Sequence, residues 1–386
     1  MKNLNNIILP GQIIGIIGGG QLGKMMALAA KAMGFRIVVL DPVPDCPCGQ
    51  VADEQIVGAY DDSHAIEQLA KKSDVVTYEF ENIHAENLDW LAKHAYVPQG
   101  TNCLKMTQDR ILEKKAIQSA GVKVAPYVVI ETIDHLHLGI HDTGLPAVLK
   151  TARGGYDGKG QVVIRHPHDL LKAEALVEQG RCVLEKWIEF EREISVIITR
   201  NPQGEVAVFP VAENLHRNNI LHQTIVPARI SKEVEERAIQ EAKKLANAFH
   251  LVGTLAVEMF VTSDEKIYIN ELAPRPHNSG HFTIEACETS QFEQHIRAIA
   301  NWPLARTDLL KPVVMVNILG EHQARLLEKI PELKDWKIHL YGKKEAKLHR
   351  KMGHVTLLRE TVEQGIQEAE ESGIWQLGQI ESGNPS

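Results

Sequence analysis

The opening segment of the chain constrains the fold more than any other. An apolar run, Ile13–Ile17, is followed by a glycine turn at 18–23. A helical stretch, Lys24–Met33, and a second apolar run, Phe35–Leu40, come next. Strand, glycine turn, helix and strand in this order are typical of a βαβ unit with parallel strands. We therefore expect an α/β protein that begins with a Rossmann-like parallel sheet.

Length indicates several domains. The chain has 386 residues, which is enough for two or three domains with separate cores. We expect a Rossmann-like domain at 1–104, a central α+β domain at 105–305 and a small, β-rich C-terminal domain at 306–386. Within the central domain, a subdomain at about 125–200 would carry a glycine-rich flap.

Composition narrows the range of partners. The net charge is −8, from 42 basic and 50 acidic residues, which argues against nucleic acid or a membrane surface as the main partner. No run of about 18 apolar residues is present, so we expect no membrane span. The five cysteines are odd in number and scattered, as expected for free thiols in a reducing cytosol. We expect a cytoplasmic protein that acts on small molecules.

Two glutamates lie on a predicted hairpin. The apolar runs Leu255–Val261 and Ile267–Leu272 read as antiparallel strands joined by a turn. If residues 263–266 form the loop, counting back places Glu258 opposite Glu271, with Cβ atoms about 5 Å apart. Mg²⁺ between the carboxylates, with phosphates completing its shell, would relieve their repulsion. A register shifted by one residue would instead send them to opposite faces of the sheet, and the hairpin alone favours neither.

The segment that follows the hairpin favours the metal site. Residues 270–281 read NELAPRPHNSGH, with Arg275 and His277 close behind a buried strand. Few structural roles need so many polar and cationic groups at the end of a strand. We therefore interpret this hairpin as part of a phosphate-handling site.

A glycine-rich loop supplies a second phosphate-binding feature. Lys150 ends a predicted strand, Leu145–Lys150, and residues 153–160 contain four glycines and two cations. The loop is no P-loop, because GxxxxGK[ST] is absent. A basic hairpin turn would not need four glycines, so we expect a flap whose amides and charges close over polyphosphate. Lys150 would then meet the α- and β-phosphates.

The glycine turn of the first domain has two readings. The pattern Gly18-x-Gly20-x-x-Gly23, with Asp41 after the next strand, fits a dinucleotide fingerprint and would make the protein an NAD-dependent oxidoreductase. No hydride-transfer apparatus follows, so we favour a phosphorylated or ribose-bearing ligand that contacts Gln21 and Leu22. Glu79 follows a strand at the edge where open α/β sheets bind ligands, although a solvated loop acid fits equally well.

Five weaker candidates each have a plain structural alternative. Residues 185–188 could present backbone groups to an adenine edge or simply end a strand. Glu193 could hold ribose hydroxyls or pair with an arginine, and His216 could face phosphate or solvent. The pair Arg350–Lys351 could clamp a phosphomonoester or only aid solubility. From spacing alone, Arg110 reads as a surface residue of a helix.

Taken together, these features resemble the ATP-grasp superfamily and, within it, the N5-carboxyaminoimidazole ribonucleotide synthase family. The resemblance covers nearly the whole chain. The motifs that carry it are GGGQLG at 18–23, YEFEN at 78–82, ARGGYDGKGQ at 152–161, NELAPRPHNSGH at 270–281 and RKMGHVT at 350–356.

The resemblance implies an activity in purine biosynthesis. ATP, bicarbonate and 5-aminoimidazole ribonucleotide would give ADP, phosphate and the N5-carbamate. It also implies Mg²⁺, for which Mn²⁺ could substitute, and a homodimer. Many ATP-grasp proteins have a third metal ligand, Asn, two positions after the second glutamate, where this chain has Ala273.

The resemblance assigns residues position by position. Mg²⁺ would be held by Glu258 and Glu271. The residues implied for catalysis are Asp157, Lys159, Arg275 and His277. Those implied for the aminoimidazole nucleotide are Gln21, Leu22, Glu79, Tyr156, Asp157, Arg275, His277, Arg350 and Lys351. Those implied for ATP are Arg110, Lys150, Gly155, Tyr156, Asp157, Gly158, Lys159, Gly160, Gln161, Glu185, Lys186, Trp187, Ile188, Glu193, His216, Asn270 and Glu271.

Three other functions are alternatives. A formate-using ATP-grasp transformylase would act on glycinamide ribonucleotide, which shares ribose 5-phosphate with the aminoimidazole nucleotide. An NAD-dependent oxidoreductase would use the N-terminal glycine turn. A non-catalytic nucleotide sensor would keep its output when Glu271 is changed to Gln, whereas the ligase would lose nearly all turnover.

Overall fold

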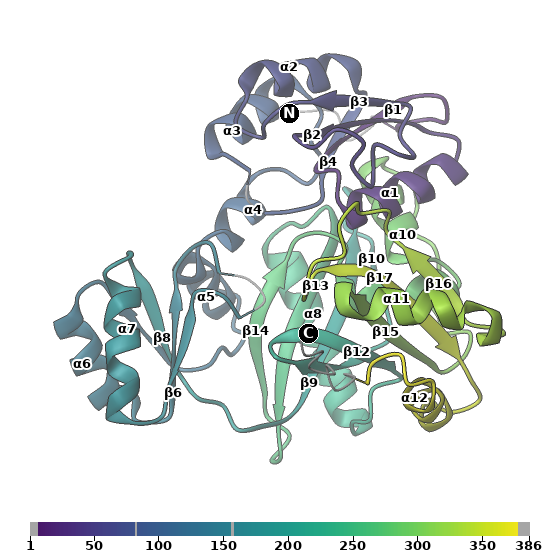
Figure 1. Cartoon of the computed structure of the whole chain (residues 1–386). Coiled ribbons are helices and arrows are strands. Elements are labelled where there is room, and N and C mark those ends of the chain that lie inside the picture. The colour runs from purple at the N-terminus through teal and green to yellow at the C-terminus, as the bar shows by residue number, and fades with distance from the viewer. Residues whose placement is uncertain (1–6, 82, 156–157, 377–386) are drawn as a thin grey trace, which may run out of the picture.

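A parallel sheet forms the N-terminal lobe, as predicted. The computed structural model describes residues 7–81, 83–155 and 158–376. Four strands lie in the order β3-β2-β1-β4, at the top of Figure 1, with helices on both sides. The elements are β1 (Ile13–Ile17), α1 (Gln21–Ala32), β2 (Arg36–Asp41), β3 (Glu54–Val57), α2 (Ser63–Lys72), β4 (Val75–Tyr78), α3 (Ala85–His94) and α4 (Asn102–Thr107).

Helix α1 begins earlier than the sequence predicts. It starts at Gln21, inside the predicted glycine turn and directly after Gly20, and not at Lys24. The carboxylate of Glu79, at the end of β4, accepts hydrogen bonds from the backbone N–H groups of Gly20 and Gly23. An acceptor at the helix N-terminus satisfies N–H groups that have no partner within the helix. The carboxylate of Glu79 therefore stabilises a helical turn directly after Gly20.

A second lobe holds a small antiparallel sheet. Its strand order is β5-β8-β6-β7, and helices α6 and α7 cover one face (Figure 1). Strand β6 starts after Pro146, two residues later than predicted, because proline offers no N–H to a sheet. The elements are α5 (Arg110–Ser119), β5 (Tyr127–Ile130), α6 (Ile133–Thr143), β6 (Ala147–Thr151), β7 (Gln161–Ile164), a 3₁₀ turn (Pro167–Asp169), α7 (Leu170–Val177) and β8 (Cys182–Lys186).

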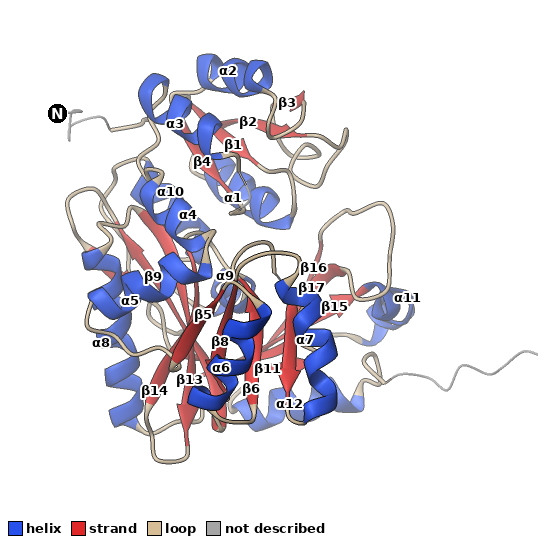
Figure 2. Ribbon diagram, turned by 90° about the vertical axis from the view of Figure 1, so that its left-hand side faces the viewer, coloured by secondary structure: helices blue, strands red, loops and turns tan. Residues whose placement is uncertain are grey.

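One large sheet forms the rest of the molecule (Figure 2). Its order is β14-β13-β9-β11-β12-β15-β17-β16, with β10 paired to β9. Its elements are β9 (Phe190–Arg200), β10 (Val206–Val208), β11 (Ala212–Arg217), β12 (Ile220–Val226), α8 (Lys232–Ala248), β13 (Gly253–Thr262), β14 (Ile267–Ala273), a 3₁₀ turn (Asn278–Gly280), α9 (Thr283–Ala286), α10 (Gln291–Ile299), β15 (Val313–Leu319), α11 (Gly320–Lys329), a 3₁₀ turn (Ile330–Glu332), β16 (Lys337–Leu340), β17 (Lys351–Leu358) and α12 (Val362–Glu371).

The C-terminal strands join the central sheet. We expected a small C-terminal domain at 306–386, and its strand β15 pairs with β12 in register from Val313↔Val226 to Val316↔Gln223, so this part of the chain extends the central sheet. The apolar side chains of β12 and β15 are buried on the same sheet, so the C-terminal strands continue the central sheet and do not form a separate one. Lys351, at the start of β17, is thereby fixed relative to the glutamate hairpin.

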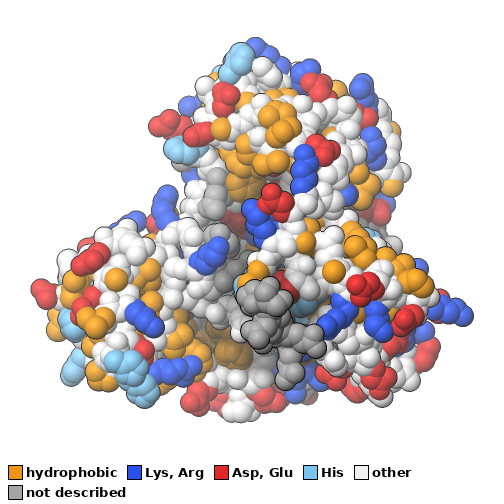
Figure 3. Space-filling view, viewed as in Figure 1, with side chains coloured by type: hydrophobic (Ala, Val, Ile, Leu, Met, Phe, Trp, Pro, Cys, Tyr) orange, Lys and Arg blue, Asp and Glu red, His pale blue; other side chains and the backbone are white. Residues whose placement is uncertain are grey.

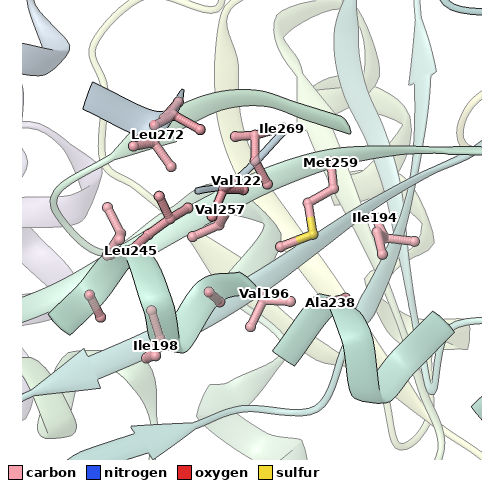
Figure 4. Close-up of a cluster of buried hydrophobic side chains, with 14 of the residues drawn as sticks. Val122, Ile194, Val196, Ile198, Ala238, Leu245, Val257, Met259, Ile269 and Leu272 are labelled. Carbon is pink, nitrogen blue, oxygen red and sulfur yellow. The ribbon is translucent and has the colours of Figure 1, made fainter. Parts of the chain in front are cut away.

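The core beneath the hairpin decides which side chains face outward. Helix α8 packs on β9 and β13, and Val257, Met259 and Leu272 lie in the cluster that Figure 4 shows. Successive side chains of a strand point to opposite faces. Because Val257 and Met259 face α8, Glu258 between them faces the other side of the sheet.

The hairpin register contains one irregularity that the sequence did not reveal. The expected loop pairs Thr262 with Ile267, but the structure pairs Val261 with Ile267, one residue off. A β-bulge at Asn270 restores the expected pairing of Glu258 with Glu271. Without the extra residue, Glu258 would face Asn270 and Glu271 would point into the core. The predicted pairing of Glu258 with Glu271 is confirmed, although the predicted register at the turn was wrong.

The face of the molecule drawn in Figure 3 shows no field of one sign. On the face in Figure 3, basic and acidic side chains are interspersed over all three lobes. Among the described residues, no helix has the length and apolar character that crossing a membrane requires.

Candidate active site

Two adjoining cavities lie where the lobes meet. The first, of about 300 Å³, lies between the small sheet and the large sheet, and the second, of about 380 Å³, lies beneath the glycine turn of the N-terminal lobe. The first is lined by residues of the hinge 185–188, the flap and the hairpin, and the second by residues of α1 and the segment 271–278. Five residues line both: Arg110, Glu271, His277, Asn278 and Lys351.

The paired glutamates line the first cavity. Glu258 and Glu271 face each other across β13 and β14, and each has one cationic or ring partner. Arg110 Nη1 lies 3.5 Å from Glu271 Oε2, and His277 Nε2 lies 3.3 Å from Glu258 Oε1. Burial, and then the charge of Glu271, raise the pKa of Glu258 to about 8. A cation between the carboxylates would remove this penalty.

These oxygens fit Mg²⁺ in number and kind. Mg²⁺ binds through one or two protein carboxylates, with substrate phosphates and water completing the shell. In the described part of the chain no group of three or more His, Cys, Asp or Glu side chains could hold a metal ion, so the two glutamates are the acidic ligands that this site supplies. Ala273 cannot supply the third ligand that the resemblance implies for many ATP-grasp proteins, but the bulge brings the amide of Asn270 to the same cavity.

A buried ion triad holds the lysine of the flap strand. Lys150 Nζ lies 3.2 Å from Glu185 Oε2 and 3.3 Å from Asn270 Oδ1. Lys114 Nζ lies 3.1 Å from the other oxygen of Glu185. Burial alone would raise the pKa of Glu185, but Lys150 and Lys114 outweigh it and lower the pKa to about 2. Glu185 therefore stays ionised and keeps the ammonium of Lys150 at the cavity wall.

Arg110 is not the surface residue that its spacing predicts. Its side chain is only 18% exposed, and Nη2 donates to the carbonyl oxygen of Gly155 at 3.3 Å. One guanidinium thus joins the flap to Glu271. Of the other flap residues, Gly158, Lys159 and Gln161 line the first cavity and Gly155 lines the second, whereas Gly160 lines neither. Tyr156 and Asp157 lie outside the described residues.

The hinge closes the far end of the first cavity. Residues 185–188 all line it, beside the apolar side chains of Val148, Val163 and Phe260. Glu193 and His216 lie at the same wall and form an ion pair. Burial favours the neutral imidazole, but the hydrogen bond and charge of Glu193 outweigh it and raise the pKa of His216. An apolar slot with polar groups at its rim is the usual form of a nucleotide-base site.

The second cavity joins the N-terminal lobe to the segment after β14. Gln21 and Leu22 line it from α1, and Arg275 lines it from the opposite wall. Glu81, which the sequence did not single out, also lines it and lies 2.8 Å from Arg275 Nε. Lys351 completes the wall from β17.

Two residues expected to contact the substrate do not line either cavity. Glu79 is buried behind the glycine turn, where its carboxylate is held by the N–H groups of Gly20 and Gly23. Arg350 is exposed, and its guanidinium donates to the carbonyl oxygen of Glu345 at 3.1 Å. In this arrangement Lys351 alone of the basic pair faces the site.

His277 connects the cavities. Its Nδ1 accepts a hydrogen bond from the backbone N–H of Ser279 at 3.3 Å, which leaves the proton on Nε2, facing Glu258. Burial, and then the charge of Arg275, lower the pKa of His277 well below its ordinary value. A neutral ring that donates from Nε2 orients Glu258 and does not itself take a proton at that atom.

Sequence reasoning missed three charged residues of the site. Glu81 follows β4, and Glu113 and Lys114 lie on α5, three and four residues after Arg110. Residues at this spacing share one face of a helix. The resemblance already assigned Arg110 to the ATP site, and the helical spacing from Arg110 was the signal that could have added Glu113 and Lys114.

Three family models match consecutive parts of the chain: a ribonucleotide synthetase preATP-grasp domain at 12–108, an ATP-grasp domain at 115–292 and a phosphoribosylaminoimidazole carboxylase C-terminal domain at 313–368.

Curated relatives cover nearly the whole chain. The N5-carboxyaminoimidazole ribonucleotide synthase of Bacillus subtilis is 56% identical over 363 residues, which are 94% of this chain and 95% of that protein. The synthase of Staphylococcus aureus strain COL is 47% identical over 359 residues, 93% of this chain and 96% of that protein.

Solved structures show the same fold. An N5-carboxyaminoimidazole ribonucleotide synthetase in complex with ADP has a TM-score of 0.95 and 59% identity, over 96% of this chain and 98% of that one. The Aspergillus clavatus synthase in complex with ADP and 5-aminoimidazole ribonucleotide has a TM-score of 0.88 and 30% identity, over 94% and 98% of the two chains. The chain belongs to the N5-carboxyaminoimidazole ribonucleotide synthase family of ATP-grasp enzymes.

Proposed function

We propose that this chain uses ATP to carboxylate 5-aminoimidazole ribonucleotide with bicarbonate, in purine biosynthesis. The observation that carries the proposal is the pair of adjoining cavities, which share Arg110, Glu271, His277 and Lys351 at their junction. One cavity has the features of a nucleotide site and the other those of a second substrate site. The junction is where a phosphoryl group would pass from one ligand toward the other.

The first cavity would hold ATP. The adenine would lie against the hinge 185–188, and Lys150 and the flap would meet the phosphates. In phosphoryl transfer the protein mainly positions the reactants and neutralises charge. The oxygen of bicarbonate attacks the γ-phosphorus and ADP leaves, giving carboxyphosphate. Arg110 and Arg275, on either side of the junction, would balance the charge of the transferred group.

Mg²⁺ would be held by Glu258 and Glu271. When bound, it would neutralise charge on the phosphate oxygens during transfer. His277 would keep Glu258 oriented toward the cavity, and Arg110 would do the same for Glu271.

The second cavity would hold the aminoimidazole nucleotide. Gln21 and Leu22 would contact it from the N-terminal lobe, and Lys351 and Arg275 would face its phosphate or the carboxyl group in transfer. Its amine attacks the carboxyl carbon, phosphate leaves, and the amine proton passes to a base. Carboxyphosphate reacts with water, so the flap must close over the junction before it forms. Asp157, Lys159 and His277 stay candidates for positioning the reacting groups.

The geometry speaks against an NAD-dependent oxidoreductase. In that class the pyrophosphate binds the N–H groups of the glycine turn. Here Glu79 occupies the N–H groups of Gly20 and Gly23, and a dinucleotide phosphate would have to displace this carboxylate. The glycine turn therefore shapes the wall that carries Gln21 and Leu22.

A substrate-omission assay tests the proposal. ADP release should require both bicarbonate and 5-aminoimidazole ribonucleotide, and removing either should abolish it. ADP release with formate and glycinamide ribonucleotide would assign the chain to the transformylase alternative. A nucleotide-binding protein without turnover on either pair would be the sensor. The change Glu271→Gln adds a second test, because a sensor should keep its output whereas the ligase should lose nearly all turnover.

The proposed assembly is a cytoplasmic homodimer. The five cysteines are buried and unpaired, which supports a reducing compartment. Light scattering coupled to gel filtration tests the dimer, and a single species of 43 kDa would contradict it.

A further inference from the structure

Glu113 is a buried carboxylate with no role in the phosphate chemistry above. It lies on α5, which packs against the edge strand β14, and its side chain is 3% exposed. Its Oε1 accepts a hydrogen bond of 2.7 Å from the backbone N–H of Leu272, the residue after Glu271. We propose that Glu113 is a positioning residue, which holds β14 in the bulged register and so keeps Glu271 opposite Glu258.

The argument begins with the directions of the N–H groups of β14. In an antiparallel strand, successive N–H groups point alternately toward and away from the partner strand. Ile269 N–H points to the open edge, where it donates to the carbonyl oxygen of Lys123 at 2.8 Å. In an unbulged strand the next outward N–H group would be that of Glu271. The bulge at Asn270 shifts the alternation, so the N–H of Leu272 points outward instead.

The hydrogen bond to Glu113 therefore distinguishes the two registers. It forms only when the bulge is present, and only the bulged register places Glu271 opposite Glu258. Leu272 acts in the same direction, because its side chain reaches the core only in this register. The side chain of Leu272 determines which face of β14 packs on the core, and the carboxylate of Glu113 holds the backbone beside Glu271.

This inference rests on the proposed role of Glu258 and Glu271 as metal ligands. Residues that orient a metal ligand change metal affinity when they are replaced, by roughly 10- to 100-fold. Mn²⁺ serves as the probe, and its free concentration is read from its electron paramagnetic resonance signal at saturating ADP. This measurement needs neither bicarbonate nor an acceptor. It therefore stands apart from the proposed reaction, whose failure would show in turnover alone.

The variants distinguish the effect of the hydrogen bond that Glu113 accepts from the effect of the volume that its side chain fills. Glu113→Met keeps the volume and removes the acceptor, and we expect Mn²⁺ affinity to fall by roughly 10- to 100-fold. Glu113→Gln keeps an acceptor oxygen and should bind Mn²⁺ nearly as the wild type does. Glu213→Gln changes a buried carboxylate outside both cavities, bonded to Arg229 at 2.7 Å, and should leave Mn²⁺ affinity unchanged. Glu113→Asp keeps the charge but shortens the reach, and it decides the question if Glu113→Met does not fold.

A double-mutant cycle provides the decisive comparison. If Glu113 acts through Glu271, Glu113→Met should weaken Mn²⁺ binding no further in a Glu271→Gln background. An equal further loss in that background would overturn the proposal. So would unchanged Mn²⁺ affinity in Glu113→Met or Glu113→Asp. Because Glu113 also borders the second cavity, weaker binding of 5-aminoimidazole ribonucleotide with intact Mn²⁺ affinity would assign it to the substrate and overturn the proposal as well.

Discussion

Replacing Glu185 with glutamine should destabilise the protein, because the ion triad with Lys150 and Lys114 favours the ionised carboxylate. Lys150 and Lys114 together hold the pKa of Glu185 at about 2, against an ordinary value of 4.5. Each pKa unit corresponds to about 1.4 kcal/mol between the ionised and neutral forms, so the ionised form is favoured by about 3 kcal/mol. Glutamine has the shape of the neutral form. We therefore expect Glu185→Gln to lower the free energy of unfolding at pH 7 by about 3 kcal/mol.

The same reasoning fixes the dependence on pH. Because the pKa of Glu185 is lower in the folded protein, its contribution is present above pH 4.5 and is lost as pH falls from 4.5 toward 2. The difference between wild type and variant should be about 1.4 kcal/mol smaller at pH 3.5 than at pH 7. Urea denaturation followed by tryptophan fluorescence measures both values.

A control and a refuting result follow directly. Glu189 is exposed, and Glu189→Gln should change stability by less than about 0.5 kcal/mol. If Glu185→Gln costs less than about 1 kcal/mol, or if its cost is the same at pH 3.5 as at pH 7, the ion triad does not hold Glu185 as described.

Three further changes test other parts of the structure. Glu81→Gln removes the charged partner of Arg275 from a partly exposed ion pair. We expect kcat/KM for the aminoimidazole nucleotide to fall, while the free energy of unfolding changes by only about 0–1 kcal/mol. Unchanged kinetics would show that Arg275 does not act in the site. A Cβ on Gly23 would lie 2.5 Å from the carbonyl oxygen of Gly18, so Gly23→Ala should cost about 1–3 kcal/mol in a denaturation experiment, and no cost would contradict the packing of the turn. Burial lowers the pKa of His295 to about 3 in the folded protein. Below pH 6.5 the ring therefore takes up a proton in the unfolded state but not in the folded state, and the free energy of unfolding falls by about 1.4 kcal/mol per pH unit. Compared with His295→Gln, the stability of the wild type should therefore fall more steeply on acidification, and parallel curves would refute this.

Sequence patterns predicted the local elements and the chemistry of the site. The strand Ile13–Ile17, the glycine turn and the next strand gave the parallel sheet, because alternation and glycine placement act over a few residues. The facing of Glu258 stayed open in the sequence, and the structure decided it by placing Val257 and Met259, on either side of it, in the core. The motifs then indicated which ligands such residues suit.

By itself, the amino-acid sequence determined the segments that form strands, the flap, the hinge and the family to which the chain belongs. Tertiary structure alone decided the bulge at Asn270, the inward turn of Glu79, the contacts of Arg110 with Glu271 and the flap, and the joining of β15 to the central sheet. Those features depend on partners far away in the chain. Strand register and side-chain direction depend on which distant residues accept a hydrogen bond or cover an apolar face. A local sequence pattern does not identify those distant residues.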